Sequence, residues 1–130
     1  MNYIEAINNG LDELMENDEN VFMMGEDIGI FEGAFKATKG LFDKYGPFRV
    51  IDTSISEGGF TGAAVGAALA GKKPIVELQF YDFVYPALDQ ITTEAAKYHW
   101  KAGKAVPMVV RGPTGCLLYT SPSPRDKHRS

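Results

Sequence analysis

Residues 54–62 of the chain read SISEGGFTG, and they follow closely on the apolar run RVID at residues 49–52. The apolar run is typical of a buried strand, and the glycines and small residues beyond it predict a turn into a helix. Glu57 therefore lies at a predicted strand-to-helix turn, where the small neighbours leave room for a ligand to approach its carboxylate. The alternative is an acid in the first turn of a helix, where the helix dipole favours negative charge.

Short apolar runs alternate with segments of helical periodicity along the chain. Strands separated by helices indicate right-handed crossovers, so the pattern predicts an α/β fold with a doubly wound parallel sheet. In such sheets ligands bind outside the carboxyl ends of the strands, which selects the loops that follow the four apolar runs. The predicted strands are residues 21–24, 50–51, 75–78 and 106–110, and the predicted helices are residues 4–15, 35–45, 61–70 and 86–98.

The end of the chain has a different character. Residues 116–130 read CLLYTSPSPRDKHRS and show neither helical nor strand periodicity. The segment resembles one reading frame of a transposase adapter used in sequencing libraries, and the alternative is a genuine Ser/Pro-rich linker. We therefore expect residues 1–115 to carry the fold and residues 116–130 to be a non-native tail that takes no part in it.

Composition limits the classes of partner. The formal net charge is −4, and it becomes −6 without residues 116–130, which hold three basic residues and one acidic residue. An acidic body without a basic cluster argues against nucleic acid and against an anionic membrane surface. The only cysteine is Cys116, so no disulfide framework or thiolate metal site is expected. No apolar run approaches the roughly 18 residues of a membrane span. We expect a soluble protein of the cytoplasm with no metal ligands of its own.

Three other motifs stand in register with residues 54–62. They read GEDIG at residues 25–29, DF at residues 82–83 and PALDQ at residues 86–90. In order and spacing, residues 1–115 resemble the beta subunit of the thiamine-diphosphate-dependent decarboxylase component of 2-oxo acid dehydrogenase complexes. The resemblance implies an N-terminal fragment of that subunit, with a truncated transketolase-like pyrimidine-binding domain.

The same resemblance assigns roles to three residues. Glu57 corresponds to the family's glutamate that meets the pyrimidine ring nitrogen of thiamine diphosphate. Glu26 corresponds to a second acid, which belongs to a proton-relay path between paired active centres; its alternative is a solvated acid in a plain turn. Phe83 corresponds to an aromatic residue that lies against the aminopyrimidine, since a flat apolar face suits a flat ring. Its alternative is ordinary core packing.

Cofactor and partners follow from the resemblance as well. The expected cofactor is thiamine diphosphate, whose magnesium diphosphate is held mainly by the alpha subunit of an α2β2 heterotetramer. The expected enzyme carries out oxidative decarboxylation of a 2-oxo acid and transfers the acyl group to lipoyl-lysine on a dihydrolipoyl acyltransferase core. Pyruvate is favoured over branched-chain 2-oxo acids and acetoin. The isolated fragment is expected to be inactive. The alternatives are another thiamine-diphosphate enzyme of the transketolase group and a noncatalytic assembly protein on the same fold.

Two features keep two interpretations each. Glu77 lies inside an apolar strand and is either paired structurally or near the cofactor, because buried acids are seldom left unpaired. Gly58, Gly62 and Gly66 recur on one helix face, and each costs about 1 kcal/mol of helix propensity, so that face needs close backbone approach within the domain or to another subunit. The family's catalytic histidine follows the RGPTG loop at residues 111–115, where this chain leaves the family pattern.

Overall fold

A computed structural model describes residues 2–114 of the chain. Within this range the chain alternates strands with helices, as the apolar pattern predicts. The strands are β1 (Val21–Gly25), β2 (Val50–Asp52), β3 (Lys73–Glu77) and β4 (Val109–Arg111). The helices are α1 (Tyr3–Asn17), α2 (Leu41–Tyr45), α3 (Glu57–Leu69), α4 (Val84–Asp89) and α5 (Ala96–Ala102), with a 3-10 turn η1 (Tyr81–Phe83) and a π-helical segment η2 (Gln90–Ala95).

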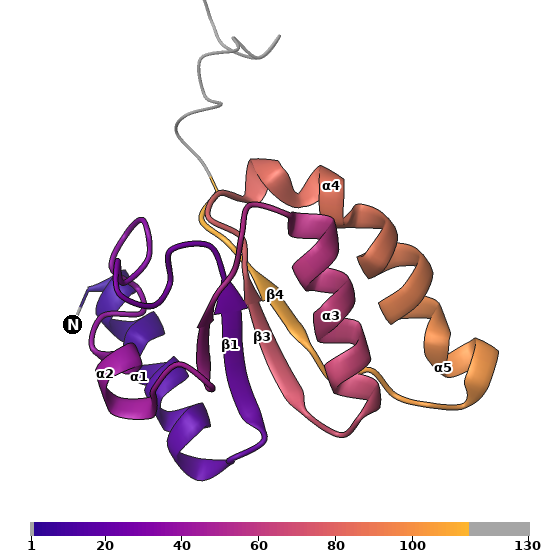
Figure 1. Cartoon of the computed structure of the whole chain (residues 1–130), viewed down its shortest axis with the longest axis horizontal. Helices are drawn as coiled ribbons and strands as arrows, with labels where there is room; N and C mark the ends of the chain where they lie inside the picture. The colour runs from indigo at the N-terminus through magenta and orange to yellow at the C-terminus, as the bar shows by residue number, and fades with distance from the viewer. Residues whose placement is uncertain (1, 115–130) are drawn as a thin grey trace, which may run out of the picture.

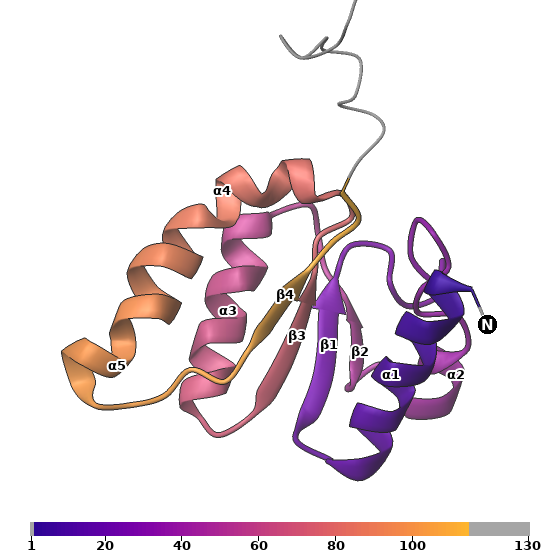
Figure 2. The ribbon, with the colours of Figure 1, turned by 180° about the vertical axis from the view of Figure 1, so that it is seen from behind.

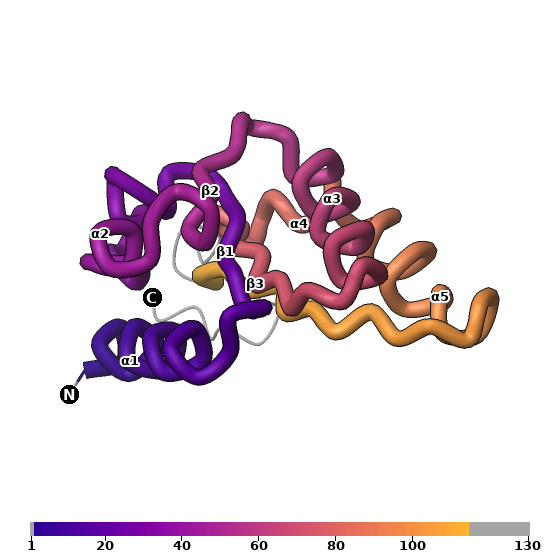
Figure 3. The backbone as a smooth tube through the Cα atoms, turned by 60° about the horizontal axis from the view of Figure 1, so that its bottom comes forward, coloured from indigo at the N-terminus to yellow at the C-terminus, as the bar shows by residue number. Residues whose placement is uncertain are grey.

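The four described strands form one parallel sheet in the order β2-β1-β3-β4. Helices α1 and α2 lie on one face of the sheet, and α3, α4 and α5 lie on the other (Figure 1). The tube view shows the same three layers from another direction (Figure 3). The predicted doubly wound parallel sheet is confirmed.

Alternation along the strands builds two separate cores. Val21 and Met23 of β1 face α1 and α2, and they pack there with Leu11 and Met15. Met24, the next residue along, faces the opposite side, in the cluster formed mainly by α3 and β3. Because successive strand side chains point to opposite faces, a strand covered on both sides must be apolar at every position. This accounts for the uninterrupted VFMM run.

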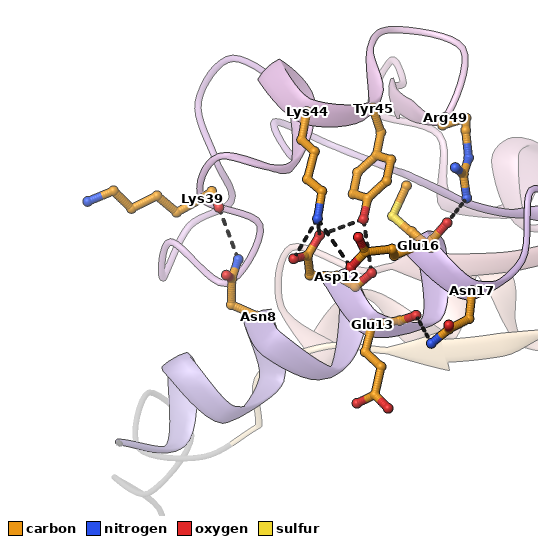
Figure 4. Close-up of polar contacts among 10 residues, drawn as sticks. Asn8, Asp12, Glu13, Glu16, Asn17, Lys39, Lys44, Tyr45 and Arg49 are labelled. Atoms are coloured by element: carbon orange, nitrogen blue, oxygen red, sulfur yellow. Dashed lines mark hydrogen bonds and ion pairs between the residues drawn. The ribbon is translucent and has the colours of Figure 1, made fainter.

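Polar contacts attach α1 to the segments that follow β1 (Figure 4). Asp12 of α1 accepts hydrogen bonds from Lys44 Nζ at 2.7 Å and from the Tyr45 hydroxyl at 2.6 Å. Asn8 donates to the carbonyl of Lys39 at 3.1 Å. Arg49, just before β2, donates to the carbonyl of Met15 in α1 at 2.6 Å. Exposed ion pairs contribute little stability on average, so these contacts mainly orient α1 over a face that the apolar core already covers.

Several element boundaries differ from the sequence expectations. The helix expected over residues 35–45 is only α2, because Lys36 and Gly40 adopt left-handed backbone angles that interrupt helical geometry. The helix expected from residue 61 begins at Glu57, where glycine lowered the apparent helix propensity. The strand expected over residues 75–78 is shifted and includes Pro74, which lies in β3. The strand expected over residues 106–110 is β4, which begins three residues later and ends one residue later.

Two of the three regularly spaced glycines of α3 pack closely inside the domain. A Cβ atom on Gly58 would lie 2.8 Å from the Pro86 carbonyl oxygen of α4, and one on Gly62 would lie 3.0 Å from Gln90 Oε1. A Cβ atom on Gly66 would meet nothing within 4 Å among residues 2–114. Close approach of α4 therefore requires glycine at position 58, whereas at position 62 the neighbouring atom is the end of the flexible Gln90 side chain.

Candidate functional site

The carboxyl ends of the parallel strands bring the sequence-predicted site residues to one edge of the sheet. Gly25 at the end of β1 pairs with Asp52 of β2 on one side and Glu77 of β3 on the other. The loops that leave these three strand ends run along the same edge, which is uppermost in Figure 2. Glu26 and Glu57 therefore approach each other although 31 positions separate them in the chain.

Glu57 is the first residue of α3, and it is 9 % exposed. Its carboxylate lies in the first turn, where the partial positive charge of the helix N-terminus favours an anion. The small residues after it are not open space for a ligand: Gly58 admits the backbone of α4, and Gly59 lies against the side chain of Ser56. The role of Glu57 stays a prediction, and the glycines that sequence reasoning explained by ligand access are explained in the structure by packing.

Glu26 directly follows β1 and is 5 % exposed. Burial raises the pKa of its carboxyl group, and the negative charges of Glu57 and Asp27 raise this pKa further. A hydrogen bond from the backbone N–H of Ser56 opposes these effects. Within the described part of the chain, Glu26 Oε1 is buried without a hydrogen-bond partner. Glu26 therefore binds a proton more readily than an exposed glutamate does, and its Oε1 is free to carry that proton.

Phe83 ends the η1 turn after β3 and is 44 % exposed. Its ring stands edge-to-face against Phe80, with 6.2 Å between the ring centroids, and Phe80 stands in the same way against Phe35 at 5.9 Å. This row of aromatic rings connects the loop after β1 to the loop after β3. Phe83 is thus held by its neighbour and retains exposed ring surface. Contact with a cofactor at this residue stays a prediction.

Glu77 has a partner that sequence reasoning did not name. It forms a buried ion pair with Arg111, the last residue of β4, whose register places it directly opposite. Burial raises the pKa of Glu77, and the Arg111 guanidinium opposes that rise. Of the two interpretations left open, the structure shows structural pairing. Arg111 was quoted in the RGPTG motif, and an arginine that ends an adjacent parallel strand was the signal for this pair.

Another contact at the edge was missed. Gln79 Nε2, just beyond β3, donates to Asp27 Oδ2 at 3.1 Å and so connects the loops after β1 and β3. Asp27 has a φ of +56°, in the left-handed region that few residues other than glycine adopt.

Among residues 2–114, no three His, Cys, Asp or Glu side chains are placed to hold a metal ion. No helix in this range is both long and apolar enough to cross a bilayer.

The described residues end at residue 114, so the expected tail and the position of the family's histidine lie outside them. The family model for the transketolase pyrimidine-binding domain matches residues 1–116.

The chain is similar to subunits of one enzyme component from several organisms. Pyruvate dehydrogenase E1 component subunit beta, mitochondrial, of Dictyostelium discoideum is 51 % identical over 113 residues, which is 85 % of this chain and 32 % of the relative. The protein of the same name from Bos taurus is 50 % identical over the same shares. Subunit beta-2 from Oryza sativa subsp. japonica is 53 % identical over 85 % of this chain and 30 % of the relative. The chain thus spans about a third of the length of these curated relatives.

The expected cytoplasmic location is wrong, because the names of these relatives place them in mitochondria. The expectation was drawn from charge, cysteine content and the lack of a membrane span. None of these properties distinguishes one reducing aqueous compartment from another. The match to the family model over residues 1–116, together with the parallel sheet and its acidic edge, gives the assignment: this chain belongs to the family of transketolase pyrimidine-binding domains.

Proposed function

We propose that this chain is the N-terminal part of the beta subunit of a pyruvate dehydrogenase decarboxylase component. The observation that carries the proposal is the burial of Glu26 beside Glu57 at the carboxyl edge of the sheet, in a chain about half identical to subunits of that name. The reaction is oxidative decarboxylation of a 2-oxo acid, pyruvate, with acyl transfer to lipoyl-lysine.

The edge of the sheet fits the pyrimidine half of thiamine diphosphate. The site offers a buried carboxylate at a helix N-terminus, a second acid with an orphaned buried oxygen, and a half-exposed aromatic ring. Glu57 would hold or release a proton at the pyrimidine ring nitrogen, and Glu26 would exchange that proton with Glu57. Phe83 would support the flat ring. The cofactor supplies the electron sink for decarboxylation, and the protein supplies position and proton affinity.

The proposed active site is composite. We propose that an alpha subunit holds the magnesium diphosphate of the cofactor, in an α2β2 heterotetramer, and that the acyl group passes to a lipoyl-bearing dihydrolipoyl acyltransferase core. The names of the relatives support this arrangement, because each is a beta subunit of one component.

The test is Glu57→Gln in the full-length subunit assembled with its alpha partner. Loss of the proton-sharing group should leave assembly intact and lower kcat with pyruvate by about 10²–10⁴-fold, the usual contribution of general acid–base catalysis. Glu19→Gln, which changes an exposed acid in the turn after α1, is the matched control and should retain full activity. Near-normal decarboxylation by Glu57→Gln would contradict the proposal and favour a noncatalytic assembly role.

A further inference from the structure

The loop that carries Glu26 is held from the end of β2. Asp52, the last residue of β2, accepts a hydrogen bond from the backbone N–H of Gly29, with 2.6 Å between Oδ1 and N. The next residue, Thr53, donates its backbone N–H to the carbonyl of Gly25 at 2.9 Å. Consecutive residues of one segment therefore hold the loop on both sides of Glu26.

Gly29 is required for this contact. A Cβ atom at Gly29 would lie 2.5 Å from Asp52 Oδ2 and 3.0 Å from the ring of Phe42. Side-chain atoms do not approach one another this closely, so any larger residue would force the carboxylate away. The Asp52 carboxylate and the backbone of Gly29 thus form one closely packed unit, which we call the Asp52 clamp.

The loop conformation depends on such contacts. Asp27 holds a left-handed φ of +56°, and its carbonyl accepts a hydrogen bond from Gly33 N–H at 2.8 Å. Ile28 is fully buried, and its carbonyl accepts a hydrogen bond from the Thr38 hydroxyl at 2.7 Å. A residue other than glycine is unfavourable with left-handed backbone angles, and it keeps them only where surrounding contacts hold the backbone in place. The Asp52 clamp holds Gly29, the residue after Ile28, and so adds a third contact that fixes the loop.

Burial of Glu26 depends on the same geometry. The backbone N–H of Ser56, four residues beyond Asp52, donates to the Glu26 carboxylate. We propose that Asp52 is a positioning residue: its carboxylate holds residues 25–29 in the conformation that buries Glu26 beside Glu57. The catalytic consequence of this inference rests on the proposed function, whereas the loop geometry does not. Asp52 acts through the backbone of Gly29 and not through the carboxylate of either acid.

The first experiment needs no cofactor. Hydrogen exchange of residues 25–33 is measured in the assembled, cofactor-free enzyme carrying Asp52→Ala, Asp52→Asn or the control Asp43→Ala, which changes an exposed acid of α2. Asp52→Ala should accelerate exchange of the Gly29 amide about tenfold or more, because it removes a hydrogen bond to a charged acceptor. Asp52→Asn keeps an acceptor oxygen and should remain close to the wild type, as should Asp43→Ala.

The second experiment measures catalysis in the same variants. Asp52→Ala should lower kcat by about tenfold or more, and the limb of the kcat pH profile set by Glu26 should move to lower pH as Glu26 leaves its buried place beside Glu57. Asp52→Asn should restore both values. A residue that only stabilises the fold would reduce the yield of assembled enzyme and leave the pH profile unchanged.

Each outcome decides a separate point. Unchanged Gly29 exchange in Asp52→Ala overturns the clamp, and faster exchange with wild-type kcat and pH profile overturns the positioning role. If Asp52→Ala fails to assemble, Gly29→Ala replaces it, because displacement of the carboxylate by the added Cβ should loosen the same loop. Wild-type activity of Glu57→Gln would refute the proposed function. The hydrogen exchange of the Gly29 amide would still test the Asp52 clamp in that case.

Discussion

The buried ion pair between Glu77 and Arg111 allows the cost of an isolated buried charge to be measured. Glu77 is 4 % exposed, and the guanidinium that offsets its burial comes from the neighbouring strand. Arg111→Met removes the cation while keeping most of the apolar stem. The carboxylate then stays buried without a countercharge, which costs about 3–5 kcal/mol of local stability.

Hydrogen exchange of the β3 and β4 amides in the assembled enzyme measures this cost locally. Since 1.36 kcal/mol corresponds to tenfold in an equilibrium, Arg111→Met should accelerate exchange by at least about a hundredfold. The double variant Glu77→Leu with Arg111→Met removes both charges and should stay within about tenfold of the wild type, because apolar replacement of a whole buried pair is often neutral.

The penalty should also depend on pH. Without Arg111 the pKa of Glu77 in the folded protein rises further above its ordinary value of 4.5. The folded state then binds a proton more readily than the unfolded state, so the penalty is complete above the folded pKa and declines as the pH falls through that value toward 4.5. Equal exchange in the single and double variants, or a penalty independent of pH, would refute this account of the pair.

Three other predictions concern the edge and the helix that carries Glu57. Phe83→Ala should weaken thiamine diphosphate binding by about three- to tenfold while Phe83→Tyr binds normally, measured by equilibrium titration of the assembled enzyme; equal affinity for both would leave Phe83 as packing. Gly58→Ala should lower the thermal unfolding temperature, because the added Cβ would lie 2.8 Å from the Pro86 carbonyl oxygen, whereas Gly66→Ala should raise it through about 1 kcal/mol of helix propensity; a reversed order would contradict the packing. Glu26→Gln should stabilise the protein at neutral pH. Because the pKa of Glu26 is raised in the folded state, the destabilisation that it causes is present above that pKa and declines as the pH falls toward 4.5; thermal unfolding from pH 8 to pH 5 should therefore show a smaller gain in stability on acidification for Glu26→Gln than for the wild type.

Much of the architecture could be read from the sequence. Uninterrupted apolar runs such as residues 21–24 indicate strands buried on both faces, and helical periodicity between them indicates crossovers, so the parallel sheet followed from local pattern alone. The same pattern placed Glu26 and Glu57 at one edge, because the carboxyl ends of parallel strands share that edge. Boundaries were less predictable, since left-handed Lys36 and strand residue Pro74 depend on tertiary contacts that outweigh local propensity.

Residue identity and spacing determined which side chains belong to the candidate site, since chain order and strand direction suffice for that. Only the tertiary structure decided their partners. Arg111 meets Glu77 through the β3–β4 register, α4 occupies the space beside Gly58, and Asp52 holds Gly29 across 23 positions of sequence. Such contacts form only when the separation between segments far apart in the chain is set to within a few tenths of an ångström. A one-dimensional pattern contains residue types and spacing, but not these distances.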